Sequence, residues 1–400
     1  MYLFRTHVSR FLLLCMAVAA LVAMAACGGN SSNSGGSTIV ASGFTRRELV
    51  LNSFFGTAVI LNGDNDQFWP SPISTTSNAT GLVVSPNKAY SIVYSATGSV
   101  MTVITNATES VSSSVALPAG TESVAILSDN KTVVAAVRNA LVTNQPTGAV
   151  VAGDITTGTV SQTIPVPLVH YISVNHAGSK VLAFADESDK AYVIDATAGT
   201  ATPVADPGNV LSRPVAAVFT TDDSKAYILS CGAECGGGTP SVTVFNASDN
   251  SLGATLPVNG ASVGLIDGSK LYVAGSPSNV GQLDVIDIGT FTRSQQGISI
   301  FNGYHTVMAV VEGGKLYIGS RNCTIDGDKG CLSVVDGTNV VNPSTRAPGA
   351  VTAIQPITGR NLAYITIGGE FIIFDTTTNA PRPSNQLDIV GNAAYVKQID

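Results

Sequence analysis

The sequence predicts an all-β fold, a β-propeller built from four-stranded blades. Three features indicate this fold: a turn-and-strand motif recurs about every 45 residues, the composition suits short strands and tight turns, and no long helical periodicity appears after residue 27. The chain has 40 glycines, 44% of its residues are hydrophobic and only 12% are charged. This composition can bury a large core of short strands and does not fit a coiled coil.

The recurring motif is a polar turn followed by a strand that opens with a basic residue. The lysines at this position are Lys88, Lys131, Lys180, Lys225, Lys270 and Lys315, which lie 43, 49, 45, 45 and 45 residues apart. A last copy carries Arg360 and Asn361 at the same place. A regular spacing of this length is the signature of a repeat architecture in which each copy is one structural unit.

A second landmark gives an independent count of the repeats. Each unit has a strand that ends in Asn or Asp before a turn rich in Gly, Thr and Ser, and an Asx side chain at that place closes the turn through its own backbone. The eight residues are Asn62, Asn106, Asp154, Asp195, Asn246, Asp287, Asp336 and Asp375. We therefore expect these residues to be structural and the chain to contain eight hairpins of one kind.

Each repeat contains four short runs of strand-forming residues. In the fifth repeat these runs are 215–220, 225–230, 241–246 and 251–258. Four strands in about 45 residues, repeated, are typical of propeller blades.

The two ends of the chain are predicted to share one blade. Residues 46–54, 57–64 and 70–75 supply the second, third and fourth strands of the first repeat, whose innermost strand is missing, and residues 393–400 form a lone strand at the other end. A ring leaves no free sheet edge when the last strand fills that gap. We predict eight blades, or seven if the N-terminal segment lies outside the ring.

The fifth and sixth repeats, at 225–258 and 270–292, resemble the YVTN-repeat β-propellers, and the resemblance extends over about residues 81–380. It implies the fold more than a function, because that family includes bacterial surface-layer and envelope proteins, and related propellers include sugar lactonases. The family's Asn is mostly Ser, Gly or Ala in this sequence. Trp69 is the only tryptophan, which argues against WD40 repeats.

The N-terminus is predicted to direct export. Residues 1–26 combine two arginines with an apolar stretch and small residues before Cys27, as in a signal peptide; the alternative is a permanent membrane helix. Residues 24–27 resemble the lipobox of bacterial lipoproteins, which implies that Cys27 is lipidated, and Gly28 implies an outer-membrane destination. Residues 27–44 are expected to be a flexible tether and 45–400 the propeller. The predicted location is thus the bacterial cell envelope, on the periplasmic or the surface side.

The net charge of −7 and the lack of any basic run exclude nucleic acid as a partner, because phosphate binding needs clustered Lys and Arg. The expected partners are the membrane, through the lipid anchor, and a protein, glycan or small ligand on the looped face of the ring. We expect a monomer.

Four cysteines remain outside the export segment, in two close pairs. In an oxidising compartment we expect the disulfides Cys231–Cys235 and Cys323–Cys331, since each closes a single loop. The alternative is a four-cysteine metal site, for which the spacing within the pairs is unusual. Both pairs fall in long loops between the second and third strands of their blades.

The second of these loops also holds Asp326 and Asp328. A D-x-D pair can ligate calcium, although the EF-hand pattern is not met, so Ca²⁺ is a weak alternative to a solvated loop. No other cofactor is indicated.

The candidate binding residues lie where the chain enters the innermost strands. His170 and His305 precede Lys180 and Lys315 by ten residues each, and Tyr171 and Tyr304 are next to them. Glu122 and Arg213 occupy similar places in other blades. At the mouth of a channel these six side chains would bind a polar ligand or do acid–base chemistry, and the alternative is ordinary rim polarity.

Three functions fit this sequence. No nucleophile elbow, P-loop, dinucleotide fingerprint or HExxH motif appears, which favours a non-catalytic envelope module that binds through the looped face. The alternatives are a lactonase-type hydrolase with a metal at the channel mouth and a structural surface-layer component.

Overall fold

The second strand of each repeat is apolar on both of its faces. Every residue of β30 (Leu362–Ile367) is buried, and so are all but the first of β10 (Thr132–Val137). The outer strand β12 (Thr159–Pro165) is instead mostly exposed. Because successive side chains of a strand point to opposite faces, burial of all of them requires a layer of protein on each side. The central strands therefore form only where every sheet has two neighbours.

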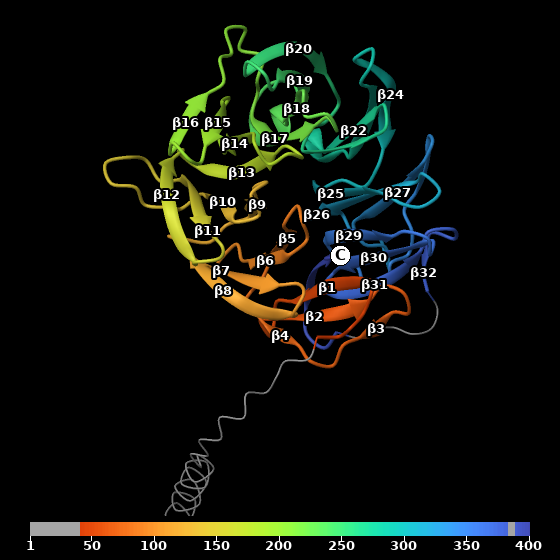
Figure 1. Cartoon of the computed structure of the whole chain (residues 1–400). Coiled ribbons are helices and arrows are strands. Elements are labelled where there is room, and N and C mark those ends of the chain that lie inside the picture. Colours follow the sequence, from red (N-terminus) through yellow and green to blue (C-terminus); the bar gives the residue numbers. More distant parts are fainter. Residues whose placement is uncertain (1–40, 383–388) are drawn as a thin grey trace, which may run out of the picture. The chain divides into compact units, whose positions relative to one another are not determined.

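The computed structural model describes residues 41–382 and 389–400, and these residues form eight antiparallel sheets arranged in a ring (Figure 1). The eight-bladed propeller predicted from the repeats is confirmed. We number the blades 1 to 8 in chain order. The predicted signal segment 1–26, Cys27 and most of the predicted tether lie outside the described residues. Within the described ranges, no helix is long and apolar enough to cross a membrane.

One strand of every blade lies innermost and three follow outward, except that the outermost strand of blade 1 is divided into two. The innermost strands of blades 1 to 8 are β33 (Ala393–Gln398), β5 (Gly81–Val84), β9 (Ser123–Ile126), β13 (Val169–Val174), β17 (Pro214–Phe219), β21 (Val263–Asp267), β25 (Tyr304–Val310) and β29 (Val351–Ile357). The second strands are β1 (Arg47–Asn52), β6 (Tyr90–Tyr94), β10, β14 (Val181–Ala185), β18 (Lys225–Ser230), β22 (Lys270–Gly275), β26 (Leu316–Arg321) and β30.

The third strands are β2 (Thr57–Asn62), β7 (Val100–Thr105), β11 (Ala149–Asp154), β15 (Ala191–Asp195), β19 (Ser241–Asn246), β23 (Gln282–Asp287), β27 (Leu332–Asp336) and β31 (Glu370–Asp375). The outer strands are β3 (Gln67–Phe68) with β4 (Ile73–Ser74), then β8 (Ser110–Ala116), β12, β16 (Thr200–Pro203), β20 (Ser251–Pro257), β24 (Thr292–Ser299), β28 (Asn339–Val341) and β32 (Ala380–Pro381).

The two chain ends meet in blade 1, as the sequence predicted. The C-terminal strand β33 pairs antiparallel with β1, and Val50 lies opposite Val396 in the register. Apolar side chains of β33 and β1 then pack against blade 8, where Val396 and Val50 share a buried cluster with Tyr364. The ring is closed by backbone pairing and by core packing, and blade 1 has no unpaired inner edge.

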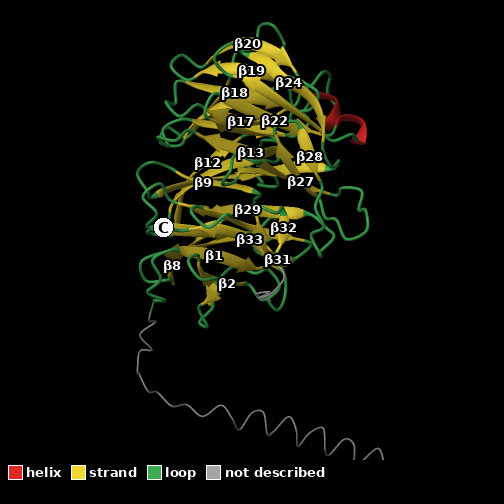
Figure 2. Cartoon of the chain, turned by 90° about the vertical axis from the view of Figure 1, so that its right-hand side faces the viewer, coloured by secondary structure: helices red, strands yellow, loops and turns green. Residues whose placement is uncertain are grey.

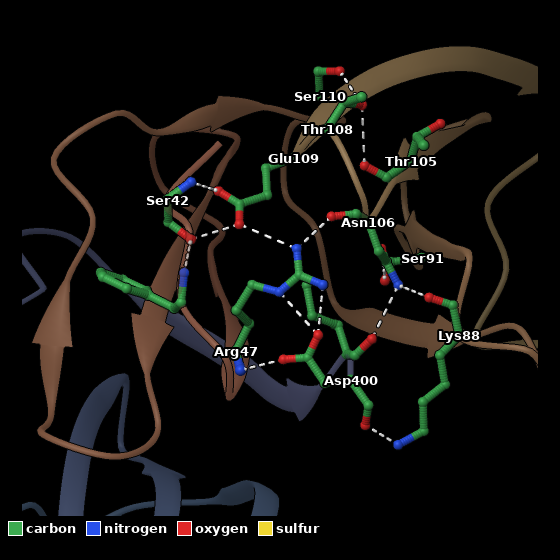
Figure 3. Close-up of polar contacts among 12 residues, drawn as sticks. Ser42, Arg47, Lys88, Ser91, Thr105, Asn106, Thr108, Glu109, Ser110 and Asp400 are labelled. Carbon is green, nitrogen blue, oxygen red and sulfur yellow. Dashed lines mark hydrogen bonds and ion pairs between the residues drawn. The ribbon is translucent and has the colours of Figure 1, made fainter. Parts of the chain in front are cut away.

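A polar cluster holds the last residue of the chain in place (Figure 3). The Arg47 guanidinium donates hydrogen bonds to the Asp400 side chain and lies 3.2 Å from Oε1 of Glu109. Nδ2 of Asn106 donates to the carbonyl oxygen of Ile399 at 3.3 Å, and Nζ of Lys88 contacts the backbone oxygen of Asp400. Blade 2 thus helps to fix the strand that closes blade 1.

The outer strand of blade 1 differs from the expectation of one strand at 70–75. It is divided into β3, which pairs with the end of β2, and β4, which pairs with its start. Pro70 and Pro72 lie between the two pieces, and proline has no backbone N–H to give to a ladder. The prediction was therefore right about pairing with β2 and wrong about continuity.

The Asx residues close turns, as predicted, at five of the eight sites. Asp154 Oδ1, for example, accepts from the Thr156 backbone N–H at 2.7 Å, and Asp195 does the same for Thr197. The other three such sites are Asn62, Asp287 and Asp375. Asn106 departs from the pattern because its side chain bonds to Ser91 and Lys88 near the ring closure.

The connections from second to third strands all lie on one side of the ring, which we call the loop face. It carries both short 3-10 helices of the described residues, η1 (Gly232–Cys235) and η2 (Pro277–Asn279), on the same side in Figure 2. Both predicted disulfides form on this face, Cys231–Cys235 and Cys323–Cys331, with Cα–Cα separations of 5.8 and 5.6 Å. The innermost strands also begin at the loop face, because each runs antiparallel to its second strand.

Candidate functional site

The walls of the central channel are made largely of small side chains. All eight blades contribute to the lining, and the cavity has a volume of about 910 Å³. Typical lining residues are Ser173, Ala217, Gly264, Thr352 and Ala394. Small residues on the innermost strands leave open space where larger ones would fill it.

Large and charged side chains gather at the end of the channel that opens on the loop face. A smaller pocket of about 300 Å³ adjoins the channel there, and His170, Tyr171 and Tyr304 line both cavities. Arg213 lines the pocket and Glu122 lines the channel. The structure therefore brings five of the six predicted mouth residues together with their side chains near one opening.

His170 lies between two carboxylates. Its Nδ1 is 2.9 Å from Oδ1 of Asp186, and its Nε2 is 3.2 Å from Oε2 of Glu122. Oδ2 of Asp186 also lies 2.6 Å from Nε of Arg138, with which it forms an ion pair. These contacts link blades 3 and 4 through a chain of alternating charges.

The carboxylates determine the protonation of His170. The hydrogen bond with Asp186, followed by that with Glu122, raises the pKa of His170 to about 9 despite partial burial. The bond from His170 lowers the pKa of Glu122 below its usual range. Burial works against the charge of Asp186, but the bonds from His170 and Arg138 outweigh it, so the pKa of Asp186 is also lowered. At neutral pH the cluster holds an imidazolium with both N–H groups donating.

Four tyrosines surround the mouth and remain neutral. Tyr171 and Tyr304 are each 38% exposed, whereas Tyr94 is mostly buried. Burial raises the pKa of these three hydroxyls and raises that of Tyr395 to about 12. All four therefore present O–H groups that can donate a hydrogen bond.

A glycine makes room for one of these rings. A Cβ built on Gly81 of β5 would lie 2.2 Å from Cζ of Tyr94, so any side chain there would displace the ring. The absence of a side chain on the innermost strand lets Tyr94 of the second strand reach the channel.

Arg321 adds a positive charge from the end of β26. Its charge acts on all four tyrosines and on Glu122. Its Nε is shielded from solvent and has no hydrogen-bond partner among the described residues. Within these residues the guanidinium also makes no ion pair, unlike Arg138 nearby.

His305 does not join this group, contrary to the expectation that both histidines share the mouth. It is 2% exposed, and its Nε2 lies 2.9 Å from the backbone oxygen of Phe301. Burial lowers the pKa of His305 to about 4, so the ring is neutral. Its residue borders the channel, but its ring is enclosed between strands.

The two orientations follow from which residue occupies the bulge of the innermost strand. In β13 the ladder skips His170, between the pairs Val169–Ala185 and Tyr171–Phe184. In β25 His305 stays in the ladder opposite Ser320, and the next residue is skipped instead. A bulge turns its extra residue away from the regular pleat. His170 is thereby turned toward the mouth, while His305 keeps the buried direction.

The remaining predicted residues have separate partners. The Arg213 backbone N–H donates to Oδ1 of Asp189 at 2.9 Å, and its Nε lies 3.8 Å from the same oxygen. Asp326 accepts from Nζ of Lys329 at 3.0 Å, whereas Asp328 accepts from the Ser344 hydroxyl. The described residues hold no cluster of three or more His, Cys, Asp or Glu side chains able to bind a metal ion.

Three residues at the mouth were not predicted from the sequence, although one pattern could have identified them: Asp186, Arg321 and Tyr94. Each lies six residues after the lysine that opens its second strand, Lys180, Lys315 and Lys88. The second strand reaches the loop face at that position, next to the start of the innermost strand. Aligning the repeats at this position would have placed all three at the mouth.

No family model matches the chain, and no curated protein matches it. Solved structures do resemble it. Dihydro-heme d1 dehydrogenase NirN in complex with DHE has a TM-score of 0.65 at 14% identity, over 88% of this chain and 75% of that one. Hydrazine synthase of Kuenenia stuttgartiensis has a TM-score of 0.56 at 14% identity, over 74% of this chain and 95% of that one.

A β-propeller domain from Myceliophteria thermophila has a TM-score of 0.51 at 11% identity, over 73% of this chain and 94% of that one. At such identities these likenesses show the propeller fold alone. The function has to be argued from the channel itself.

Proposed function

We propose that this protein is a lipid-anchored module of the bacterial cell envelope that binds a small ligand in its central channel and does not catalyse a reaction. The observation that carries the proposal is the channel of about 910 Å³ with its few convergent polar groups at one mouth. Ligand sites commonly have volumes of about 300–1,000 Å³ and a small number of polar groups on otherwise apolar walls.

The state of His170 favours binding over acid–base catalysis. A general base must be unprotonated and must have a nitrogen free to take a proton. His170 has a pKa raised to about 9, and both ring nitrogens are engaged by carboxylates. Its role in our proposal is to fix the positions of Glu122 and Asp186 at the rim. The lactonase-type hydrolase remains the alternative, and metal retained by the purified protein would support it.

The place where the chain enters the ring is compatible with an anchor. The first described residues lead into β1 at Arg47, and β1 runs from there to Asn52 at the loop face. The first strand of the ring therefore begins on the side opposite the channel mouth. In the proposal, Cys27 carries the lipid and the mouth is left free for ligand.

Lipidation is tested by labelling cells with an alkyne analogue of palmitate and comparing the wild type with Cys27→Ala. We expect the wild type to be labelled and to sediment with membranes, whereas the variant should be unlabelled and soluble or unprocessed. A labelled variant would contradict the assignment of the anchor to Cys27.

Channel binding is tested by purifying the protein from its own envelope and identifying co-purifying small molecules by mass spectrometry. We expect a retained molecule that is lost from the double variant Tyr171→Ala, Tyr304→Ala. The matched control is Tyr192→Ala, a half-buried tyrosine on β15 in the same blade as Tyr171. Retention by the double variant would place the ligand elsewhere.

We also propose that the protein is a monomer, which light scattering of the soluble chain would verify. Ordered self-association in the same measurement would instead support a surface-layer role.

A further inference from the structure

Arg321 is half-buried, its Nε is shielded from solvent, and it has no anionic partner among the described residues. Other partly buried arginines have one: Arg360 lies 2.6 Å from Asp66, and Arg47 lies 3.2 Å from Glu109. Withdrawing a guanidinium from water costs free energy unless a partner compensates for it. At Arg321 the Nε is shielded and unpaired. A negatively charged group entering the channel would supply the missing partner.

The surroundings of Arg321 provide hydrogen-bond donors rather than acceptors. The hydroxyls of Tyr94, Tyr171, Tyr304 and Tyr395 all lie within range of its charge and are neutral at physiological pH. A phenol donates to an anion through a short, charge-assisted hydrogen bond. Tyr304 is also the register partner of Arg321 across β25 and β26, so the two side chains start from adjacent backbone.

The charge at the mouth differs in sign from that of the whole chain. The two adjoining cavities are lined by four cationic side chains, Arg138, His170, Arg213 and Arg321, and by three carboxylates, Glu122, Asp186 and Glu187. The chain as a whole carries −7. Glu122 and Asp186 are both engaged by His170, so the charge of Arg321 is the one left uncompensated at short range.

We infer that the channel ligand is an organic carboxylate with a flat apolar body, and that Arg321 is the residue that anchors its carboxylate. This inference rests on the proposed binding function. A single guanidinium fork matches the two oxygens of a carboxylate, and the planar tyrosine rings offer faces against which a flat body can stack. The small side chains deeper in the channel leave room for that body.

The test uses two probes of the same shape, 2-naphthoate and the neutral 2-naphthamide, with the full exported protein and isothermal titration calorimetry. We expect naphthoate to bind at least about 10-fold more tightly than naphthamide, because hydrogen bonds from a guanidinium to a carboxylate are stronger than those to a neutral amide. Arg321→Met should lower the affinity for naphthoate to that for naphthamide and leave naphthamide unchanged. Arg321→Lys keeps the positive charge but loses the two-pronged guanidinium. Its affinity for naphthoate should lie between those of the wild type and of Arg321→Met.

Lys270→Met is the control, since it removes one positive charge at an exposed position that opens β22 on the opposite face. It should bind both probes as the wild type does. Circular dichroism melting curves show whether each variant is folded. Equal affinity of the wild type for the two probes would overturn the carboxylate inference while leaving channel binding intact. Binding of neither probe would count against the proposed function as well.

Discussion

His170 and His305 are equivalent by sequence count in two blades, yet the structure gives them different positions in the strand and opposite chemistry. Each lies ten residues before the lysine that opens its second strand. His170 is held between Asp186 and Glu122 at the channel mouth, whereas His305 is buried against the Phe301 carbonyl. The bulge faces the same place on the second strand in both blades, but the following turn has six residues in blade 4 and five in blade 7, so His170 is the bulged residue and His305 precedes the bulge. The comparison shows that an equal distance from a repeat landmark does not ensure an equivalent backbone position, because one residue less in a turn shifts the register.

The largest expected contrast is in the ionisation of the two rings. Side-chain NMR of the imidazole resonances should give a titration midpoint of about 9 for His170 and of about 4 for His305. The carboxylates cause the first shift and burial causes the second. Midpoints close to each other for the two residues would remove the basis of the comparison.

The second largest expected difference is in the loss of stability when each histidine is replaced by alanine. His305→Ala removes a buried ring and leaves the Phe301 carbonyl unpaired, so we expect it to lower the free energy of unfolding by about 3 kcal/mol. His170→Ala removes a partly exposed ion-paired ring and should cost about 1 kcal/mol or less. Urea denaturation measures both. A larger loss for His170→Ala than for His305→Ala would show that the mouth cluster, not the buried ring, supports the fold.

The free energy of unfolding should depend on pH through both histidines, and in opposite directions. The pKa of His305 is depressed in the folded state, so the stability that the neutral ring contributes is lost as the pH falls below 6.5 toward 4. The pKa of His170 is raised when folded, so its contribution is complete below 6.5 and is lost as the pH rises through 9. Difference curves of His305→Ala and His170→Ala against the wild type isolate each window. A difference curve for His170→Ala that stays flat between pH 6.5 and 9 would contradict its assignment.

The smallest expected effect separates the two carboxylates that hold His170. The bond with Asp186 is the largest cause of the raised pKa, and the bond with Glu122 is the second. Asp186→Asn should therefore lower the pKa of His170 more than Glu122→Gln does, as measured by NMR titration of each variant. Asp189→Asn is a suitable control, because this carboxylate also lies on the loop face but pairs with Arg213. A greater shift for Glu122→Gln would mean that Nε2 is the more tightly held nitrogen.

The fold was largely predictable because its determinants are local and repeated. The Lys and Asx landmarks mark the start of the second strand and the end of the third, and in the fifth repeat the predicted strands agree with β17 to β20 within one residue at either end. The shared blade at the chain ends followed from counting strands, and β33 pairs with β1 as expected. The outer strand of that blade was misjudged because Pro70 and Pro72 interrupt it.

The site was predictable only in part. Repeat position placed Glu122, His170, Tyr171, Arg213 and Tyr304 near the mouth, and the two cysteine pairs form the disulfides expected from their spacing. Asp186, Arg321 and Tyr94 were not predicted because they lie at or just after the ends of second strands, and reach the mouth from outside the innermost strands. Their approach depends on side-chain length and on local space, such as the missing Cβ of Gly81.

Most of the ring follows from the amino-acid sequence, because patterns within single repeats and the count of them predicted most of its strands, its turns and its closure. Which charges at the mouth have partners depends instead on how the folded blades pack together. That outcome depends on where each β-bulge falls and on which blades are neighbours, because a bulge of one residue redirects a side chain and a carboxylate from the next blade changes its pKa. His170 acquired two such partners, Arg321 acquired none among the described residues, and His305 was buried away from both.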